Sequence, residues 1–400
     1  MKHFVHICLC SPYTESWGYQ ENILPKIQEK KGFLVTVIAT CTTYSEEHST
    51  EIVQCSPSEK LIENIRIIRV LPKGNRNSLK NKIFPKYDIF DLLNSLQPDA
   101  VMIHGLGTYG SNKSIIKFIK YIRQNNRSCF IAGDTHRFLE VAPRAVTLKQ
   151  KMIQYIREKE IIRLVPYYDA IYAITPACMD YAEKYYDIAP KKIKLLPLGY
   201  DPYMIDYCHR KEIRSKVRLK YGINEKSILI VHGGKITKRR KTIELLRAFQ
   251  KIGNINCKLL IFGEMSKECK KECETLIEEN SQQIIYTNAL SQKEYLNIFL
   301  SADLGVFPGG QSVLWQEAIG CGLPLIVGKA DNISYLDRGG NICFVDGNDI
   351  DEIGIRIKEC LDERKLEQMR IIAETDGRKF FSYDSISQII EEDMKKYYEE

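Results

Sequence analysis

The chain has 400 residues, of which 44% are hydrophobic and 27% are charged, and its formal net charge is +7. This composition supplies enough apolar surface for two domains with hydrophobic cores and excludes an intrinsically disordered protein. No apolar run approaches the ~20 residues of a membrane-spanning helix, and the strand-like segment at 3–10 is broken by Ser11-Pro12 too early for a signal peptide.

Short β-branched runs alternate with amphipathic stretches of helical length, which is typical of parallel sheets covered by helices. A first series of strands is predicted near 3–10, 33–40, 65–70, 98–104, 128–133, 169–174 and 192–196, and a second near 227–232, 257–263, 283–287, 303–307, 324–328 and 341–345. Helices are predicted at 20–31, 112–124, 147–164, 176–186, 240–252, 267–279, 291–300, 312–320 and 383–398. The fold class is therefore α/β, with two doubly wound Rossmann-like domains.

The boundary between the domains is predicted where two prolines and a glycine interrupt the pattern, in the segment 195–202. We expect a first domain at 1–201, a second at 202–378, and a final helical segment at 379–400 that packs back on the first domain. Ligands of open α/β sheets bind beyond the carboxyl ends of the strands, so the loops there are the places to look for chemistry.

The first such loop, Ser11 to Gln20, lacks the GxGxxG and P-loop patterns, which argues against ordinary dinucleotide and P-loop binding. Gly18 at the helix start could let backbone N–H groups approach a phosphate, or it could be a plain turn residue. Its aromatic residues could stack on a sugar or simply pack the rim of the site. These residues are Tyr13, Trp17 and Tyr19.

A strongly basic stretch lies between residues 112 and 163, where twelve Lys and Arg face four Asp and Glu. Its net charge of +8 favours an acidic partner, and an anionic membrane surface fits better than nucleic acid because no nucleic-acid-binding motif accompanies it. A solvated helix face is the alternative interpretation.

The second domain opens with a strand, two glycines and a run of cations before a helix. Lys235 and Arg240 belong to this run, which follows Gly233-Gly234 at the carboxyl end of the strand, where phosphate is expected. A third loop repeats strand, glycines and helix at 307–318. There the helix start offers free N–H groups to a phosphate, and Glu317, one turn inside, could reach ribose hydroxyls or merely complement the helix dipole.

Together these segments resemble the family 4 glycosyltransferases, the large retaining family of GT-B fold within glycosyl transferases group 1. The resemblance covers essentially the whole chain and rests on spaced motifs. These are Gly234-Lys235 through Arg240-Lys241 to Ala248-Phe249, the strand ending in Gly263-Glu264, Glu317-Ala318 through Gly322-Leu323-Pro324, the junction Pro197 to Asp201, and Ala132 to His136 with His104 on the preceding strand.

The resemblance implies a nucleotide-sugar donor held mainly by the second domain and a glycan or lipid-linked acceptor on the first. Lys235, Arg240 and the N–H groups of Ser312 and Val313 would hold the diphosphate, where cations and helix dipoles stabilise the charge that develops as the sugar leaves. No metal and no cofactor are expected. The implied catalytic residues are His136, Lys235, Arg240 and Glu317, and the implied donor-binding residues are Gly18, Gly234, Gly263, Glu264, Leu290, Gly310, Gln311, Ser312 and Val313.

His136 would lie near the sugar and hydrogen-bond to it, although a structural histidine is the alternative, more so for His104. The residues Thr287 to Leu290 would face the base, but their composition does not distinguish uracil from guanine; we favour a UDP-sugar over a GDP-sugar.

Three features depart from the family pattern, of which Leu198 in place of the junction's usual Asn is the minor one. The EX7E motif has two glutamates, and counting back from Glu317 reaches Gly309, so the first acid is missing; either Asp134 or a backbone group replaces it, or activity is lost. In the phosphate-binding run, Lys235 and Arg240 invert the usual order of arginine and lysine, and these two cations bind phosphate differently.

Metal chemistry finds little support in the sequence. The 13 cysteines are scattered without a CxxC pair, as expected for reduced thiols in the cytoplasm. Asp349-Ile350-Asp351 spells the DxD of metal-dependent glycosyltransferases, but it opens a predicted helix, where aspartates serve as caps.

The sequence thus predicts a retaining, metal-independent glycosyltransferase of surface polysaccharide biosynthesis, cytoplasmic or peripheral on the inner face of the membrane. The alternatives are a catalytically inactive GT-B partner or scaffold subunit, which Gly309 motivates, and a nucleotide-sugar 2-epimerase, for which no matching acidic set is present.

Overall fold

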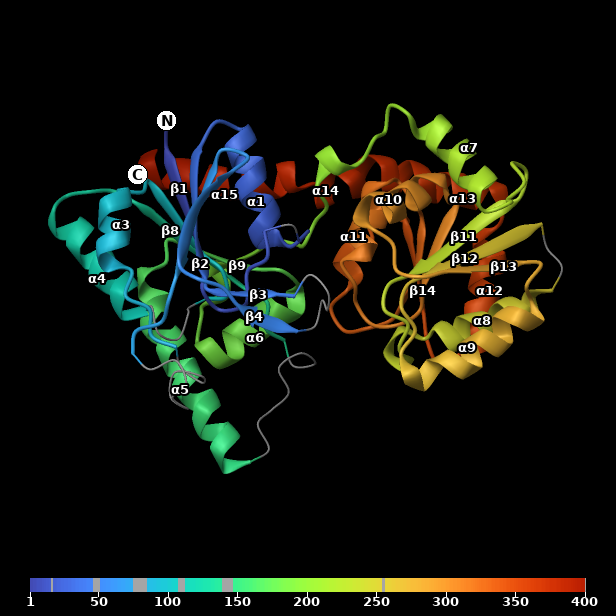
Figure 1. Ribbon diagram of the computed structural model, residues 1–400, viewed down its shortest axis with the longest axis horizontal. Coiled ribbons are helices and arrows are strands. Elements are labelled where there is room, and N and C mark those ends of the chain that lie inside the picture. Colours follow the sequence, from blue (N-terminus) through green and yellow to red (C-terminus); the bar gives the residue numbers. More distant parts are fainter. Residues whose placement is uncertain are drawn as a thin grey trace. The chain divides into compact units, whose positions relative to one another are not determined.

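The computed structural model describes residues 1–15, 17–45, 51–74, 85–106, 112–138, 147–253 and 256–399. The chain divides into two compact units (Figure 1): the first consists of Met1–Pro197 with Ile386–Glu400, and the second of Leu198–Ser385. The first unit thus ends at residue 197 where the sequence predicted 201, and the final segment changes unit at residue 386, inside a helix, where the sequence predicted 379.

The first unit is built on an eight-stranded sheet with the order β10-β9-β8-β7-β1-β2-β6-β5. All neighbouring strands are parallel except β5, which runs antiparallel to β6. The strands are β1 (His3–Cys8), β2 (Leu34–Thr40), β5 (Ser58–Ile62), β6 (Ile65–Val70), β7 (Ala100–Ile103), β8 (Phe130–Thr135), β9 (Ala170–Ala173) and β10 (Ile193–Leu195). Because these strands are parallel, the ends of β1, β7 and β8 lie at one edge of the sheet.

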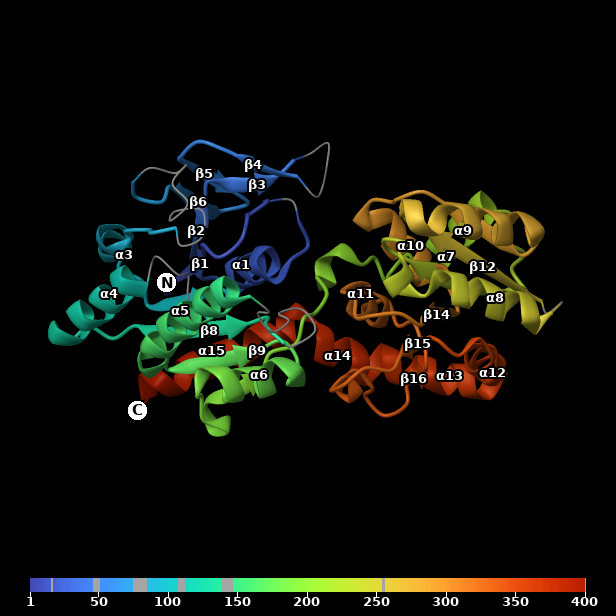
Figure 2. The ribbon, with the colours of Figure 1, turned by 90° about the horizontal axis from the view of Figure 1, so that it is seen from below.

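Helices connect these strands and cover the sheet. They are α1 (Gln20–Lys30), α3 (Phe90–Leu96), α4 (Asn112–Gln124), α5 (Leu148–Leu164) and α6 (Pro176–Tyr186). The C-terminal helix α15 (Tyr383–Glu399) runs beside β8 and β9 (Figure 2), where Asp393 accepts a hydrogen bond from the hydroxyl of Tyr172 and the ring of Tyr397 packs on Phe130. The last helix of the chain is therefore part of the first unit's core.

Several elements of the first unit were not predicted from the sequence. They are the edge strand β5, the helix α3 and the antiparallel hairpin of β3 (Thr42–Tyr44) and β4 (Ile52–Gln54). The two hairpin strands have three residues each and are at most half-buried, so they carry too little hydrophobic periodicity to be recognised.

The second unit is built on a six-stranded, all-parallel sheet with the order β13-β12-β11-β14-β15-β16. The strands are β11 (Ile228–Gly233), β12 (Cys257–Phe262), β13 (Ile284–Thr287), β14 (Leu304–Phe307), β15 (Leu325–Gly328) and β16 (Ile342–Val345). The helices are α7 (Arg210–Lys220), α8 (Thr242–Ile252), α9 (Lys267–Glu279), α10 (Gln292–Ser301), α11 (Leu314–Gly320), α12 (Ile350–Cys360), α13 (Glu363–Ile372) and α14 (Arg378–Phe381).

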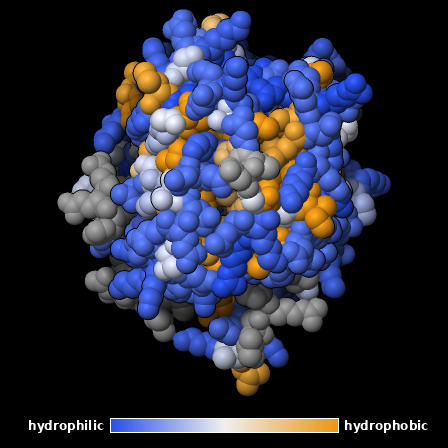
Figure 3. Space-filling model, turned by 90° about the vertical axis from the view of Figure 1, so that its right-hand side faces the viewer, coloured by the Kyte–Doolittle hydropathy of each residue, from blue (hydrophilic) through white to orange (hydrophobic). Residues whose placement is uncertain are grey.

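Apolar side chains fill both faces of this sheet. Along β11, Leu229 and Val231 enter one hydrophobic cluster and Ile230 enters the other, because successive side chains of a strand point to opposite faces. Burial on both faces explains why the strands read as continuous apolar runs in the sequence. On the outside, Figure 3 shows hydrophilic side chains around scattered hydrophobic ones.

The helix α8 begins two residues later than predicted, and this changes the setting of Arg240. Residues Lys238–Arg240 form a 3-10 turn, and Lys241 then adopts a left-handed backbone conformation with φ of 57° before α8 starts at Thr242. Arg240 therefore lies in a loop turn and not on the helix. Similarly, α11 begins at Leu314, which leaves Ser312 and Val313 in the loop before it.

Candidate functional site

Two glycine-containing loops meet at the carboxyl ends of β11 and β12. The N–H of Gly234 donates to the carbonyl of Phe262 at 3.1 Å, and both Gly234 and Gly263 have positive φ values, of 104° and 135°. A Cβ atom added at Gly263 would lie 1.9 Å from the carbonyl oxygen of Gly234. Only glycine lets the two backbones approach this closely, which forms a bare backbone surface beside the cationic loop.

Arg240 holds the loop that follows β14. Its Nη1 atom donates to the carbonyls of Gly310 at 2.6 Å and Gln311 at 2.9 Å. Burial, and then the neighbouring Arg239, lower the pKa of Arg240 below its usual value. The structure thus gives Arg240 a role that the sequence did not predict, because one edge of its guanidinium fixes the backbone of the two donor-binding candidates Gly310 and Gln311.

The backbone around Gly309 leaves no room for a side chain at the position of the first EX7E acid. A Cβ atom at Gly309 would lie 2.4 Å from the carbonyl oxygen of Arg239 and 2.4 Å from the carbonyl carbon of Arg240. A glutamate at this position would therefore collide with the turn that carries the cations. The glycine and the placement of Arg240 belong to one local arrangement.

Glu317 lies on α11 and is only 5% exposed. Its carboxylate accepts hydrogen bonds from Gln292 Nε2 at 2.8 Å and from the hydroxyl of Tyr295 at 2.9 Å. Burial raises the pKa of Glu317 to about 7, although these two hydrogen bonds act in the opposite direction. Gln292 and Tyr295 come from α10 and were not predicted from the sequence; their spacing of three residues on one helix face was the available signal.

The other predicted donor-binding residues are arranged around this loop and strand end. Lys235 and Glu264 are exposed, and the carbonyl of Glu264 accepts the N–H of Ile236 at 2.9 Å. Leu290 packs against the hydrophobic cluster under the sheet. The carbonyls of Ser312 and Val313 accept the N–H groups of the first turn of α11, so their own N–H groups precede the helix.

In the first unit, polar side chains converge on Asp134 at the end of β8. Its carboxylate is fully buried and accepts hydrogen bonds from His104 Nδ1 at 2.7 Å, the N–H of Gly105 at 2.7 Å and Gln20 Nε2 at 3.2 Å. His136 Nε2 lies 3.4 Å from Asp134 Oδ1. With these neighbours and no exposure, Asp134 is a buried anchor, which argues against its replacing the missing acid beside the donor.

A chain of hydrogen bonds continues from Asp134 into the core. His104 Nε2 lies 3.0 Å from His6 Nδ1, and His6 Nε2 lies 2.7 Å from the side-chain oxygen of Gln28. Burial, and then His104, lower the pKa of His6 to about 3, so this ring is neutral at physiological pH. His6 and Gln28 were missed, although a histidine in the middle of an apolar strand was a usable signal.

The charges in this cluster set its electrostatics. Burial alone would raise the pKa of Asp134, but His104 and His136 outweigh it and hold that pKa well below its usual range. Burial likewise acts to lower the pKa of His136, but Asp134 outweighs it, so the pKa of His136 is raised. The side chain of His136 is 39% exposed, and it is the member of this cluster that a ligand can reach.

The aromatic residues of the first loop pack on the protein itself. The ring of Trp17 stacks on Tyr44 with a centroid distance of 4.5 Å, and Tyr19 meets Trp17 edge to face. Tyr13 is buried at 4% exposure. Of the two interpretations of these side chains, packing is the one that their contacts support. Gly18 lies directly before Tyr19, the residue that caps α1.

The predicted site residues therefore form two groups. Lys235, Arg240, Glu317 and the glycine loops lie at the carboxyl edge of the second unit's sheet, whereas His136 and Gly18 lie at that of the first unit's sheet. Each group is assembled by one unit. The group in the second unit presents cations and bare backbone that can bind an anion. The group in the first unit presents an imidazole that is held in place by a carboxylate.

The DxD sequence is a helix cap, as predicted. The Asp349 side chain accepts the N–H groups of Asp351 and Glu352, and the Asp351 carboxylate pairs with Lys251 at 2.7 Å. Among the residues that the structure describes, no group of three or more His, Cys, Asp or Glu side chains is placed to hold a metal ion. Among the helices of the described residues, none has both the length and the apolar character that crossing a membrane requires.

Comparisons with known proteins bear on the second unit and on the fold. The family model described as glycosyl transferases group 1 matches residues 213–376, which lie in the second unit. A curated relative, the GDP-mannose-dependent monoacylated alpha-(1-6)-phosphatidylinositol monomannoside mannosyltransferase of Corynebacterium glutamicum, is 23% identical over 164 residues. That match spans 38% of this chain and 42% of the relative.

Solved structures match over the whole length. A glycosyltransferase of Rickettsia africae ESF-5 is similar with a TM-score of 0.69 and 12% identity, covering 99% of this chain and 98% of that one. Sucrose-phosphate synthase of Thermosynechococcus elongatus has a TM-score of 0.66 and 13% sequence identity, and the match covers 100% of both chains. Anabaena Alr3699/HepE in complex with UDP has a TM-score of 0.65 and 13% sequence identity, and the match covers 99% of this chain and 100% of that one. At these identities the likeness establishes the fold.

Proposed function

We propose that this chain, which has the GT-B fold and carries a glycosyl transferases group 1 domain at residues 213–376, transfers a sugar from a nucleotide-sugar donor to an acceptor with retention of anomeric configuration. The observation that carries the proposal is the cationic turn at Arg240, held against glycine loops at the carboxyl edge of the second sheet, with the buried carboxyl of Glu317 on the adjoining helix.

The diphosphate of the donor is expected at the Arg240 turn. Nη1 of Arg240 is engaged by the loop carbonyls, which leaves the remaining guanidinium N–H groups to meet phosphate oxygens. Lys235 is exposed and would add a second cation, and the N–H groups of Ser312 and Val313 precede α11. These groups stabilise the negative charge that builds up on the diphosphate as the bond to the sugar breaks.

Glu317 is suited to recognise the ribose hydroxyls. With a pKa of about 7, its carboxyl group can accept a hydrogen bond in the ionised form or donate one in the neutral form. Gln292 and Tyr295 hold the carboxyl group in place, so the orientation of the ribose would be fixed before the donor arrives. Replacing Glu317 with alanine should therefore weaken donor binding, and replacing Arg240 with alanine should mainly slow transfer.

His136 is the proposed group of the first unit that hydrogen-bonds the transferred sugar. Asp134 fixes the imidazole at 3.4 Å and favours its charged form. In a retaining reaction the acceptor hydroxyl attacks from the face that the diphosphate leaves, and the departing phosphate takes the proton. The role of His136 is then to orient the sugar.

The base and the partners belong to the same proposal. We favour a UDP-sugar, a preference that the UDP complex of the Anabaena protein supports, whereas the curated relative is named for GDP-mannose. No metal or cofactor is expected to be needed. The acceptor is expected to be a glycan or a lipid-linked glycan of surface polysaccharide biosynthesis, met in the cytoplasm or at the inner face of the membrane.

The basic stretch is the proposed contact with an anionic membrane. The structure describes it at 112–138 and 147–163, where α4 and α5 carry most of its lysines and arginines; residues 139–146 of this predicted surface lie outside the described part. Flotation with vesicles that contain or lack anionic lipid tests this contact, and absence of binding at every salt concentration would contradict it.

A thermal-shift screen tests the donor site directly. Ligands that bind the folded state raise the melting temperature, so we would screen UDP, GDP, ADP and CMP and their sugars, each with and without EDTA. A selective shift that EDTA does not change, followed by release of the nucleotide when an acceptor mixture is added, is the expected result. A shift without transfer to any acceptor would favour the inactive subunit, and interconversion of the free nucleotide-sugar would favour a 2-epimerase.

A further inference from the structure

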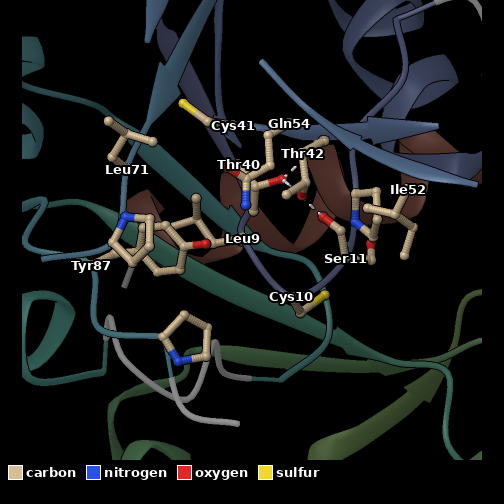
Figure 4. A pocket seen from close by; sticks show the side chains of 13 residues that line it. Leu9, Cys10, Ser11, Thr40, Cys41, Thr42, Ile52, Gln54, Leu71 and Tyr87 are labelled. Carbon is tan, nitrogen blue, oxygen red and sulfur yellow. Dashed lines mark hydrogen bonds between the residues drawn. The ribbon is translucent and has the colours of Figure 1, made fainter. Parts of the chain in front are cut away.

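A pocket of about 300 Å³ opens in the first unit, at the carboxyl ends of β1, β2 and β6 (Figure 4). The loop after β1 supplies one wall, the end of β2 and the hairpin of β3 and β4 supply the second, and the segments after β6 and before α3 supply the third. Its volume lies at the lower end of the range for small-molecule sites, and a single six-membered ring fits such a space.

The described part of this pocket's lining is uncharged. Of the residues that the structure describes, thirteen line it, and none of these is Asp, Glu, Lys, Arg or His. The apolar members include Leu9, Ile52 and Leu71, with proline rings beside them. Among these thirteen side chains a phosphorylated or carboxylated ligand would find no counter-charge to offset its lost hydration, so they disfavour anions.

Hydroxyl groups alternate with this apolar surface. The hydroxyls of Thr40 and Thr42 lie 2.8 Å apart and belong to a hydrogen-bonded group that includes the carbonyl of Ser11. Tyr87 is 7% exposed, and Figure 4 shows its hydroxyl end beside Leu9 within the pocket. A lining with flat apolar faces and a few hydroxyl groups matches a pyranose or cyclitol, whose C–H face is apolar and whose rim carries hydroxyls.

The pocket adjoins the Asp134 cluster through one side chain. Cys10 lines the pocket, and its thiol donates to the carbonyl of His104 at 3.1 Å. Gly105 follows His104 and donates its N–H to Asp134, and a Cβ atom at Gly105 would lie 2.7 Å from Cys10 Sγ. A ring in the pocket would therefore lie one residue layer from the carboxylate that anchors His136.

We propose that this pocket binds a neutral, unphosphorylated sugar or cyclitol ring, and that this ring is part of the acceptor. The second half rests on the proposed function, because only a transferase needs an acceptor. The first half depends on the pocket alone. The inference restricts the acceptor to one whose terminal or penultimate ring carries no phosphate or carboxylate where it enters the protein.

The test measures ring binding separately from sugar transfer. Saturation-transfer difference NMR on the full-length protein would use methyl α-D-mannopyranoside, methyl α-D-glucopyranoside, N-acetylglucosamine and myo-inositol at millimolar concentration, with mannose 6-phosphate as the charged counterpart. The variant Leu71→Trp fills the pocket. The matched control, Leu61→Trp, places the same side chain at a leucine of β5 that is 72% exposed. Tyr87→Phe removes one hydroxyl and keeps the ring.

We expect at least one neutral ring to bind wild type and Leu61→Trp alike, mannose 6-phosphate to bind neither, and Leu71→Trp to abolish binding. Tyr87→Phe should weaken binding by roughly tenfold, as the loss of one hydrogen bond predicts. Failure of every neutral ring to bind folded wild type, equal binding by Leu71→Trp, or equal binding of the phosphorylated ring would overturn the proposal. The thermal shift with UDP reports the second unit, so its absence would count against the proposed function and not against the pocket.

Discussion

At the scale of single residues, two opposing influences act on the pKa of Glu317. Burial raises it, whereas hydrogen bonds from Gln292 and Tyr295 favour the ionised carboxylate and lower it. Burial dominates and raises its pKa from 4.5 to about 7. The folded chain therefore binds more protons than the unfolded chain between those two values, and its stability falls as pH rises across that window. Tyr295 and Gln292 limit this effect without cancelling it.

Glu317→Gln should remove this pH dependence. Relative to the wild type, the free energy of unfolding of the variant should increase by up to about 3 kcal/mol as pH rises from about 4.5 to about 7. Urea unfolding at several pH values measures it, with Glu264→Gln as the control because Glu264 is exposed. Parallel pH profiles for wild type and Glu317→Gln would mean that the buried carboxyl is already ionised.

Asp134 has the converse role, because its ionised form is the one that folding favours. Asp134→Asn keeps the shape of the side chain but removes the charge that raises the pKa of His136, so that pKa should fall. The loss of a buried, paired charge should also cost about 3 kcal/mol of folding free energy. Histidine titration by NMR and thermal unfolding measure the two effects.

The control for this substitution is Asp169→Asn in the same unit. Asp169 accepts the N–H of Ile131 and does not contact His136, so this variant should leave the titration of His136 unchanged. An unchanged His136 titration in Asp134→Asn itself would show that the imidazole does not depend on the carboxylate.

At the scale of elements, the turn of residues 238–241 and the loop at 308–311 are built as one piece. Gly309→Ala should destabilise the protein by about 2 kcal/mol, because its Cβ atom would overlap the backbone of Arg239 and Arg240. Donor binding should weaken with it, since the backbone of the donor-binding candidates Gly310 and Gln311 would be displaced. Thermal shift with and without UDP reports both quantities.

Gly354→Ala is the matched control for Gly309→Ala. Gly354 lies inside α12, where an added Cβ atom would find ordinary contacts at 3.7 Å, so alanine should stabilise the helix by roughly 0.5–1 kcal/mol. If Gly309→Ala were tolerated as well as Gly354→Ala, the loop would have to be able to move away from the turn.

The start of α12 offers a test of the two interpretations of the DxD sequence. Asp349→Ala removes the helix cap and should cost about 1 kcal/mol of folding free energy. Asp351→Ala removes an exposed pair with Lys251 and should change stability by no more than about 0.5 kcal/mol. Both variants should retain transfer activity; loss of activity in both, restored by added divalent metal, would favour the metal-binding interpretation.

At the scale of the whole molecule, the predicted diphosphate and ribose contacts all belong to one unit. Lys235, Arg240, Ser312, Val313 and Glu317 lie within Leu198–Ser385. This segment expressed alone should therefore fold and show the same thermal shift with UDP as the full chain, while transferring no sugar because His136 and the acceptor side are missing. Loss of the shift in a folded fragment would mean that the first unit contributes directly to donor binding.

The sequence by itself determined the two-sheet architecture and the GT-B fold class, which the structure and the fold comparisons confirm. It could do so for two reasons. Parallel strands that are buried on both faces appear in the sequence as continuous apolar runs. The glycines and cations that follow these strands lie close together in the sequence, so they mark the loops at the carboxyl ends of the strands. Its resemblance to glycosyl transferases group 1 is confirmed over residues 213–376, and its cap interpretation of Asp349 is confirmed as well.

Only the tertiary structure decided which side chains meet across elements. Gln292 and Tyr295 hold Glu317, Arg240 braces the loop at Gly310, and His6 and Gln28 continue the chain from Asp134, in each case through contacts between residues that are distant in sequence. Hydrophobic periodicity shows which face of a single helix or strand is buried, and motif spacing shows where that element ends. They carry no information about the partner that packing brings to it, which is why the buried polar contacts and the pocket of the first unit became visible only in the folded chain.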